Sequence, residues 1–314
     1  MVLRKNEKRK ANIKRDKYVD NLEYVLMSLP GIICVIIFAY IPMFGIIIAF
    51  KNFNPNLGVF GSEWNGFDNF KYFLESNMFV RLIRNTVGYN LAFLVINNIA
   101  NITLAIMLYN VNKKWQLKYY QTTFILPSFM SMVLISYIVY MFLSPSAGFL
   151  NKLILLLGGE GVDWYSEPKA WPFVLTFVNM WKGVGMGSLI YYTVLVGIDE
   201  TLFEAAEIDG ANQWEKIKNI IIPSLTSLLC LQIIMGLGHI MSIGMELFYQ
   251  IPRNQGILYP VTDVISTYTF RMLQTGGDYG INTAIGLFGS VTGTIMVLVS
   301  NAVIKKIDED SSMF

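Results

Sequence analysis

Two long apolar segments of this 314-residue chain carry polar or small residues at helical spacing. They are Asn179, Lys182, Gly183 and Met186 in residues 171–198, and Gln232, His239, Ser242 and Glu246 in residues 223–246. Gln232, His239 and Glu246 recur every seven residues, so a continuous helix would place them on nearly one face. An unpaired charge at the centre of a bilayer costs about 2.5–3.5 kcal/mol or more, so Lys182 must face a watery cavity or a partner.

These two stripes can lie at the same depth. Lys182 is sixteen residues from Ile198, and His239 is sixteen residues from Pro223. At the rise of an α-helix, each residue is about 24 Å from the inner end of its segment. We predict that the stripes line a path for a polar ligand, while a structural polar network that locks the two helices together is the alternative.

A charged loop over residues 199–222 joins these two segments and reads as two short helices with a turn. Thr201 and Glu204 fit a capping box at the first helix, and Asn212 with Glu215 can cap the second. Gly210 can turn the chain between them. The apolar side of the pair consists of Leu202, Phe203, Ala206, Trp214, Ile217 and Ile221. Such a surface suits a groove on another protein, and an ordinary amphipathic loop at the membrane surface is the alternative.

Motifs for catalysis are missing from the sequence. There is no Gly-x4-Gly-Lys-Ser/Thr phosphate loop, so the chain is not predicted to be an ATPase. With a single histidine, an intramembrane metalloprotease is also not expected. We therefore predict that the chain is not an enzyme and that a partner supplies the energy for any work it performs.

Composition places the chain in the membrane. Hydrophobic residues make up 54% of it and charged residues 15%, with a mean hydropathy of +0.47. Six continuous apolar stretches are long enough to span hydrocarbon at about 20 residues each, which predicts an all-α membrane protein with six transmembrane helices. The stretches are Tyr24–Phe50, Asn85–Tyr109, Tyr119–Phe142, Trp171–Ile198, Pro223–Glu246 and Ile281–Ile304.

Basic residues set the expected orientation, with both termini in the cytoplasm. The N-terminal tail alone holds eight of them, and the inner side reaches fifteen against eight in the outer loops. Cys34 and Cys230 fall inside predicted spans, so we expect no disulfide framework.

Six positions of the charged loop match a known signature in register. They are Glu204, Ala205, Ala206, Gly210, Ile220 and Pro223, with Ile222 where the pattern has Leu. This stretch resembles the EAA signature of binding-protein-dependent ABC importer permeases. From Arg81 to Ile304 the chain resembles the type-1 permease fold of that family, in its carbohydrate branch. The similarity to that branch rests on Gly197–Ala211, Met241–Glu246 and Asp263–Tyr268 ahead of Arg271, with Asp199 where many sugar permeases have Pro.

The resemblance implies a division of the chain into four parts. Residues 1–22 would be a basic cytoplasmic tail, and residues 23–80 the first transmembrane helix with an outer loop. Residues 81–305 would be the permease domain, with its coupling loop at 199–222, and residues 306–314 a cytoplasmic C-terminal tail.

The resemblance also implies a function. The chain would be the permease subunit of an ATP-driven importer in the bacterial cytoplasmic membrane, where it translocates an oligosaccharide or glycan fragment. Its partners would be a second permease subunit in a heterodimer, two cytoplasmic ATPase subunits, an extracellular solute-binding protein and the lipid bilayer, with no nucleic acid. The chain itself would bind no cofactor, because ATP and magnesium belong to the partner ATPase.

Coupling to the ATPase would fall to Glu204, Ala205, Ala206, Asp209, Gly210, Trp214 and Pro223. By the same resemblance, Glu204 would meet a basic residue of the ATPase, Gly210 would set the bend, and Trp214 would enter the groove. Two other functions fit parts of the sequence. One is an importer permease for peptides or amino acids, and the other is an ion-coupled secondary transporter that uses Lys182 and Glu246.

Overall fold

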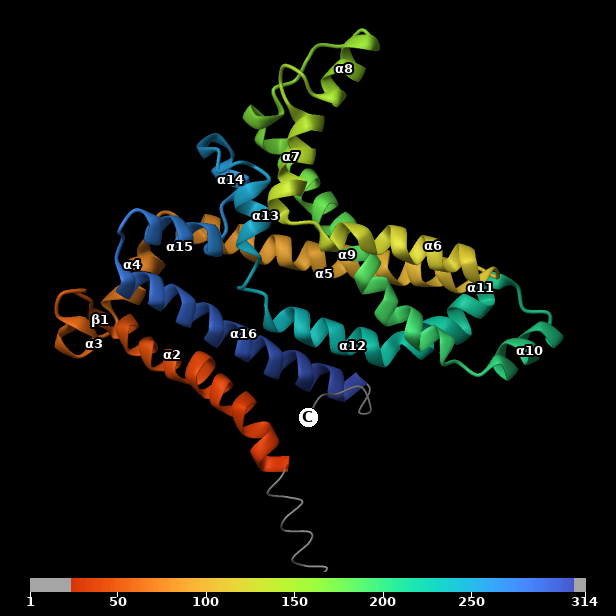
Figure 1. Ribbon diagram of the computed structural model, residues 1–314, viewed down its shortest axis with the longest axis horizontal. Coiled ribbons are helices and arrows are strands. Elements are labelled where there is room, and N and C mark those ends of the chain that lie inside the picture. Colours follow the sequence, from red (N-terminus) through yellow and green to blue (C-terminus); the bar gives the residue numbers. More distant parts are fainter. Residues whose placement is uncertain (1–23, 308–314) are drawn as a thin grey trace, which may run out of the picture. The chain divides into compact units, whose positions relative to one another are not determined.

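The computed structural model describes residues 24–307, and the expectations for the two charged tails lie largely outside this range. These residues divide into two compact units, one of residues 24–70 with 279–284 and the other of residues 71–278 with 285–307. Nearly all of the regular structure is helical, as expected (Figure 1). The elements named in Figure 1 are α2 (Ile41–Met43), β1 (Lys51–Asn52), α3 (Gly58–Gly61), α4 (Asp68–Glu75), α5 (Phe79–Tyr109), α6 (Lys114–Ile125), α7 (Met132–Leu143), α8 (Phe149–Leu156), α9 (Trp171–Val196), α10 (Glu200–Ile208), α11 (Gln213–Lys216), α12 (Ile222–Gly238), α13 (Met245–Gln250), α14 (Tyr259–Thr262), α15 (Ile265–Gln274) and α16 (Tyr279–Ile307). A second short strand, β2 (Glu63–Trp64), pairs antiparallel with β1.

Five helices within the described residues are long and apolar enough to cross a membrane, or six if one bent pair counts as a span. The five are Tyr24–Phe50, Phe79–Tyr109, Pro168–Val196, Gln213–Gly238 and Tyr279–Lys306. The expected all-α membrane architecture is therefore confirmed. The differences from the sequence-based expectation lie in the third and fifth spans.

In the first unit, a buried lysine organises the segment that follows the first span. The Lys51 ammonium donates to the carbonyl oxygens of Val59 at 2.7 Å and Ser62 at 3.2 Å, at the end of α3. The Asn69 amide donates to the carbonyl oxygens of Ala49 and Lys51, at 2.9 and 3.0 Å. These bonds give hydrogen-bond partners to backbone carbonyl groups in a segment that has little regular structure.

Two spans widen into a π-helical turn just before a proline. The first lies at Ile36–Tyr40 ahead of Pro42, and the second at Ile217–Ile221 ahead of Pro223. Proline has no N–H, and its ring clashes with the carbonyl four residues earlier, so a wider turn relieves the contact without ending the helix. The second π turn joins α11 to α12 in one continuous helix.

The expectation of a continuous third span over Tyr119–Phe142 was wrong. Helix α6 ends in a short 3-10 turn at Leu126–Phe129, and α7 then leaves at an angle of 98°. Pro127 lies in the 3-10 turn, and Ser131 caps α7 by accepting a hydrogen bond from the Leu134 N–H. The apolar pattern continues through the break, so hydropathy alone does not reveal it.

The fifth span also differs from Pro223–Glu246, because it begins at Gln213 and ends at Gly238. Helix α12 ends at Gly238, and an irregular stretch follows before α13 begins at Met245. Gly236 and Gly238 lower helix propensity here. A close approach to α16 adds to this effect, because a Cβ on Gly293 would overlap the carbonyl oxygen of Gly238.

Helices α5 and α9 form the centre of the second unit and run in the same direction. Asn97 of α5 donates to Asn179 of α9 at 2.8 Å, and Tyr191 further along α9 donates to Asn98 at 2.5 Å. Helix α6 lies against α9 where Gly185 meets the backbone of Phe124, a contact that leaves no room for a side chain. In Figure 1, α9 crosses α5 and α6 near the centre of this unit.

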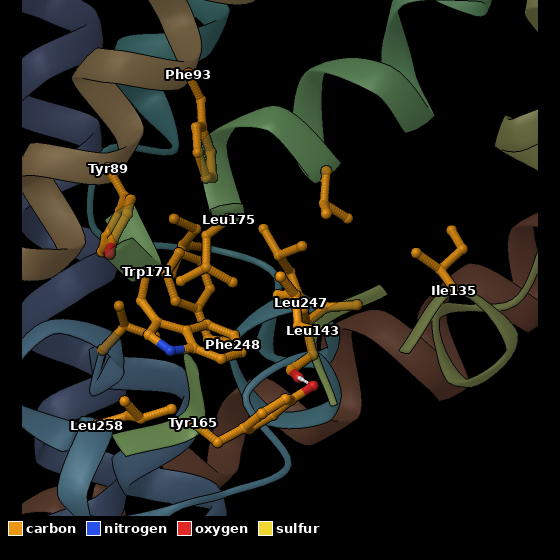
Figure 2. Close-up of a cluster of buried hydrophobic side chains, with 14 residues drawn as sticks. Tyr89, Phe93, Ile135, Leu143, Tyr165, Trp171, Leu175, Leu247, Phe248 and Leu258 are labelled. Carbon is orange, nitrogen blue, oxygen red and sulfur yellow. Dashed lines mark hydrogen bonds between the residues drawn. The ribbon is translucent and has the colours of Figure 1, made fainter. Parts of the chain in front are cut away.

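A buried aromatic and aliphatic cluster holds the ends of these helices to the loop that carries α13 and α14. Tyr89 of α5 contacts Phe248 of α13 at a ring distance of 4.7 Å, and Tyr165 contacts Trp171 of α9 at 5.1 Å. Figure 2 shows Trp171 lying beside Phe248 in this cluster. Its indole N–H donates to the Trp164 carbonyl at 2.7 Å, so the buried polar atom is satisfied.

An ion cluster around Asp263 ties α15 to the start of α5. The carboxylate is 1% exposed, and it accepts from Arg81 at 3.1 Å, from Arg271 at 2.5 Å and from Thr267 at 3.0 Å. The Asn85 amide donates to the Asp263 backbone carbonyl at 2.9 Å. Asp263 and Arg271 belong to the segment whose sequence resembles sugar permeases, and the structure gives both a packing role.

Replacing Asp263 tests how much this ion cluster contributes to the stability of the fold. We expect Asp263→Ala to lower the free energy of unfolding by about 3–5 kcal/mol, because two arginines lose their buried counter-charge. Reversible unfolding of the purified protein in detergent measures the change. Glu160→Ala, which removes an exposed loop carboxylate, should stay within about 0.5 kcal/mol. Equal stability of the two variants would contradict a structural role for the ion cluster.

Candidate functional site

The charged loop folds as the expected helix–turn–helix, but its first cap differs from the prediction. Helix α10 begins at Glu200, and its N-cap is Asp199, whose side chain accepts a hydrogen bond from the Thr201 N–H at 3.0 Å. This bond lowers the pKa of the Asp199 carboxyl. The Thr201–Glu204 capping box was therefore wrong. The Asp199 carboxylate takes over the capping role.

The turn itself is as predicted. Gly210 has a φ of +79°, a left-handed conformation that favours glycine. The Ala211 N–H bonds to the Ala206 carbonyl and the Gly210 N–H to the Glu207 carbonyl, the pattern of a Schellman motif. The capping box of Asn212 and Glu215 at the start of α11 is confirmed.

An ion pair that sequence reasoning missed joins the two helices of the loop. The Lys216 ammonium donates to the Glu207 carboxylate at 2.6 Å, and Lys216 is only 7% exposed while Glu207 lies at the surface. The hydrogen bond from Lys216, and then its charge, lower the pKa of the Glu207 carboxyl. The nine-residue separation crosses a turn, so no helical spacing rule points to this pair.

The apolar side chains of the loop divide into two sets. Phe203, Ile217 and Ile221 face inward against a buried cluster that includes Tyr109 of α5 and Leu195 of α9. The prediction that these three belong to an exposed docking face was wrong, because the loop needs them to hold itself against the spans. The exposed apolar set is Leu202 at 51%, Ile208 at 87% and Trp214 at 71%.

The remaining predicted coupling residues lie on or near this exposed side. Glu204, Ala205, Asp209 and Pro223 are exposed, and Ala206 is half-buried. Sequence reasoning missed Ile208, although its position next to the turn residues Asp209 and Gly210 gave some indication. The exposed set, which we call the loop tip, consists of Leu202, Ile208 and Trp214.

Four of the eight predicted pathway residues line one cavity of about 630 Å³. They are Asn179, Lys182 and Gly183 from α9 and Glu246 from α13. Ser128 and Met132, on the two sides of the break in the third span, also line this cavity. The structure thus brings Glu246 to Lys182 through the irregular stretch after α12, whereas the prediction relied on a continuous helix.

Lys182 holds the break in the third span. Its ammonium donates to the backbone carbonyls of Ser128 at 3.0 Å and Met130 at 2.7 Å. Carbonyls at a helix break lack their intrahelical partners, and an unsatisfied polar group in a bilayer costs several kcal/mol. The lysine therefore has a structural task at the same place where it borders the cavity.

Gln232 and His239 line a second cavity of about 400 Å³ between α5, α9 and α12. Four asparagines of α5 share its wall, and none of them is among the eight predicted pathway residues: Asn90, Asn97, Asn98 and Asn101. The sequence did offer a signal, because Asn97 and Asn101 are one helical turn apart and could line a pathway, although interhelical hydrogen bonding is the more common use of such residues. The single seven-residue stripe was therefore wrong, because α12 ends before His239 and the stripe divides between two cavities. Met186 and Ser242, both exposed, line neither cavity.

The two cavities offer hydrogen-bond donors and acceptors and no nucleophile arranged with a base. Within residues 24–307, no group of three or more His, Cys, Asp or Glu side chains is placed to hold a metal ion. Amide, ammonium and carboxylate groups on α5, α9 and α13 can bind the hydroxyls of a polar solute. This arrangement suits passage of a ligand more than its chemical conversion.

Comparison with known proteins gives consistent matches along nearly the whole chain. The sequence profile of the family described as "Binding-protein-dependent transport system inner membrane component" matches residues 101–309. Protein LplB of Bacillus subtilis (strain 168) is 34% identical over 300 residues, covering 96% of this chain and 92% of that protein. The polygalacturonan/rhamnogalacturonan transport system permease protein YteP of the same organism is 30% identical over 309 residues, covering 98% and 95%.

Solved structures match over the same range. One is the crystal structure of a bacterial ABC transporter involved in the import of the acidic polysaccharide alginate. Its matching chain has a TM-score of 0.84 and 33% identity, with 95% of this chain and 99% of that chain covered. A second structure shows a bacterial alginate ABC transporter in complex with an alginate pentasaccharide-bound periplasmic protein, at a TM-score of 0.83 and 33% identity.

The ion pair within the loop predicts a pH dependence. Because the folded pKa of Glu207 is depressed, its contribution to stability is complete above the ordinary glutamate value of 4.5 and is lost as pH falls through the lower folded value. NMR titration of the labelled Glu207 carboxyl should therefore give a midpoint below 4.5, and Lys216→Met should return it toward 4.5. A midpoint at or above 4.5 in the unaltered protein would show that the pair does not form in solution.

Proposed function

The chain belongs to the family of inner membrane components of binding-protein-dependent transport systems, and we propose that it is a permease subunit of an ATP-driven carbohydrate importer. Its fold is that of type-1 ABC importer permeases, and it is a multi-pass integral membrane protein of the bacterial cytoplasmic membrane. Its proposed role in the importer is based on how the loop over residues 199–222 connects to the spans on either side of it.

The observation that carries the proposal is the covalent continuity of the loop with the cavity walls. Helix α10 follows α9 directly, and α11 continues through the π turn into α12. Helix α9 lines both cavities and α12 lines the second. Because the Glu207–Lys216 pair ties α10 to α11, a push on the loop moves the ends of both spans together.

Two cytoplasmic ATPase subunits are the partners that the loop tip fits. Leu202, Ile208 and Trp214 project from a helix pair whose inner face is fixed by Phe203 and Ile217. Exposed aromatic and aliphatic anchors on a rigid element are typical of a surface that enters a groove on another protein. Glu204 lies beside them and would pair with a basic residue of the ATPase. ATP and magnesium would be bound there, and this chain would bind no cofactor.

A carbohydrate ligand is supported by the relatives and by the cavities. YteP is named for polygalacturonan and rhamnogalacturonan, and the solved transporters import alginate. The asparagine-rich cavity wall, together with Lys182 and Glu246, offers the donors and acceptors that sugar hydroxyls use. An oligosaccharide or glycan fragment is the proposed ligand class, in preference to a peptide or amino acid. An ion-coupled secondary transporter would not need a loop that binds an ATPase, so that alternative does not account for the coupling loop.

Two further parts complete the proposed machine. An extracellular solute-binding protein would deliver the ligand, and a matching structure holds a bacterial alginate ABC transporter in complex with an alginate pentasaccharide-bound periplasmic protein. A second permease subunit would form the other half of the pathway, as a heterodimer. The permease domain would cover residues 81–305, with coupling loop 199–222, between a first span with its outer loop at 23–80 and a short C-terminal tail at 306–314. The tail over residues 1–22 would be cytoplasmic.

Coupling is tested at the loop tip. We expect Ile208→Glu to abolish uptake of radiolabelled oligosaccharide and to prevent co-purification of the ATPase subunits, because a charge cannot enter an apolar groove without a partner. Ile208→Leu keeps the apolar surface and is the matched control, with uptake within about twofold of the unaltered protein. Insertion of both variants into the membrane should be equal, because the side chain is exposed. Normal uptake by Ile208→Glu would remove the loop tip from the coupling mechanism.

The orientation is tested by labelling. In a background with Cys34 and Cys230 replaced by Ala, a cysteine at position 212 should be shielded from an impermeant thiol reagent added to intact cells. Cysteines at positions 65 and 166, in the proposed outer loops, should react. Permeabilised cells serve as the control, since there all three positions should react. Labelling at position 212 in intact cells would reverse the proposed topology.

A further inference from the structure

Lys182 makes no ion pair among the described residues, although the carboxylate of Glu246 lines the same cavity. The residue lies near the middle of α9, and no carboxylate of the described residues lies within 4.0 Å of its ammonium. The backbone carbonyls of Ser128 and Met130 orient the ammonium, but they are neutral groups. An uncompensated cation in the centre of a bilayer is costly, so the cavity beside it must supply water or an anion.

One donor of Lys182 remains for the cavity. An ammonium has three N–H donors, and two of them are used by the carbonyls at the break in the third span. The cavity of about 630 Å³ borders the same side chain. A donor that is already fixed in position loses little conformational entropy when it binds, which makes this ammonium a preorganised anion-binding group.

Three of the cavities that α9 borders together contain more positively than negatively charged side chains. At the starts of α5 and α9, a cavity of about 390 Å³ is lined by Arg84 and Thr176. The cavity with Lys182 adds a second cation, and the asparagine-rich cavity adds no lysine, arginine or carboxylate. Across these three cavities the only carboxylate is that of Glu246. These three cavities therefore favour anionic ligands over cationic ones.

We propose that Lys182 forms a carboxylate subsite and that the transported carbohydrate is acidic, with uronate residues. This proposal rests on the proposed function and adds the charge of the ligand to it. The uronate carboxylate takes the third N–H of Lys182, while Glu246 on α13 accepts from sugar hydroxyls. The Asn179 carbonyl oxygen already accepts from Asn97, so its NH2 group remains as a further donor for the ligand. The same ammonium would thereby bind both the ligand carboxylate and the backbone carbonyls at the break in the third span.

The test compares an anionic probe with its uncharged methyl ester. Trigalacturonate and its fully methyl-esterified form are titrated into the purified complex of the permease subunits with the ATPases, without the solute-binding protein, so that only the membrane site discriminates between them. We expect the unaltered complex to bind the acid at least about tenfold more tightly than the ester, which corresponds to about 1.4 kcal/mol. Lys182→Gln should remove this preference, because its amide can still donate to the carbonyls of Ser128 and Met130 but carries no charge. Lys182→Arg should retain the preference, because it keeps the charge.

Size-exclusion chromatography of each variant complex shows that the subunits remain assembled. Equal affinity of the unaltered complex for acid and ester, an unchanged preference in Lys182→Gln, or no binding of either probe would overturn the carboxylate subsite. Uptake of neutral oligosaccharides by intact cells in any of those cases would leave the carbohydrate importer standing. Failure to take up any glycan of a mixed neutral and acidic panel would instead overturn the proposed function.

Discussion

Backbone carbonyls within a bilayer must find partners inside the protein, and this constraint shapes the centre of the molecule. The third span breaks by 98°, which frees the carbonyls of Ser128 and Met130. Lys182 of α9 satisfies both, at the cost of placing a charge in the membrane. The cavity next to the lysine then offsets part of that cost by admitting water or a ligand. A structural requirement and a candidate binding site are in this way joined in one side chain.

Close helix packing makes this geometry possible. Gly185 lets α9 approach the backbone of Phe124 at the end of α6, three residues along α9 from Lys182. Without that approach the ammonium would not reach the carbonyls at the break. A second close contact, between Gly293 of α16 and the carbonyl of Gly238, accompanies the end of α12. The chain then turns back through an irregular stretch, and α13 delivers Glu246 to the cavity.

The proposed coupling loop is stabilised differently, because it lies at the end of the spans. Its rigidity comes from a Schellman turn at Gly210, a capping box at Asn212 and the ion pair of Glu207 with Lys216. The inward side chains Phe203 and Ile217 fix the helix pair against α5 and α9. A loop this well fixed transmits a displacement rather than absorbing it, which is consistent with the proposed coupling to a separate ATPase.

The sequence by itself determined the membrane class, the approximate positions of the spans, the helix–turn–helix loop and its turn residue. These properties depend on local composition and on backbone preferences. The length of an apolar run predicts a membrane span, and a turn that requires a positive φ favours glycine. The family and its carbohydrate branch were indicated by the resemblance of several segments to known permeases, and the comparisons with relatives agree with both.

Only the tertiary structure decided how the polar residues group. The break in the third span and the end of α12 lie within runs of apolar residues, where hydropathy does not change, so Gln232 and His239 were wrongly placed on one stripe with Glu246. The inward turn of Phe203 and Ile217, the exposure of Ile208 and the Glu207–Lys216 pair depend on contacts between segments that are separate in the chain. Side-chain periodicity describes one element at a time, whereas these features are set by how neighbouring elements pack.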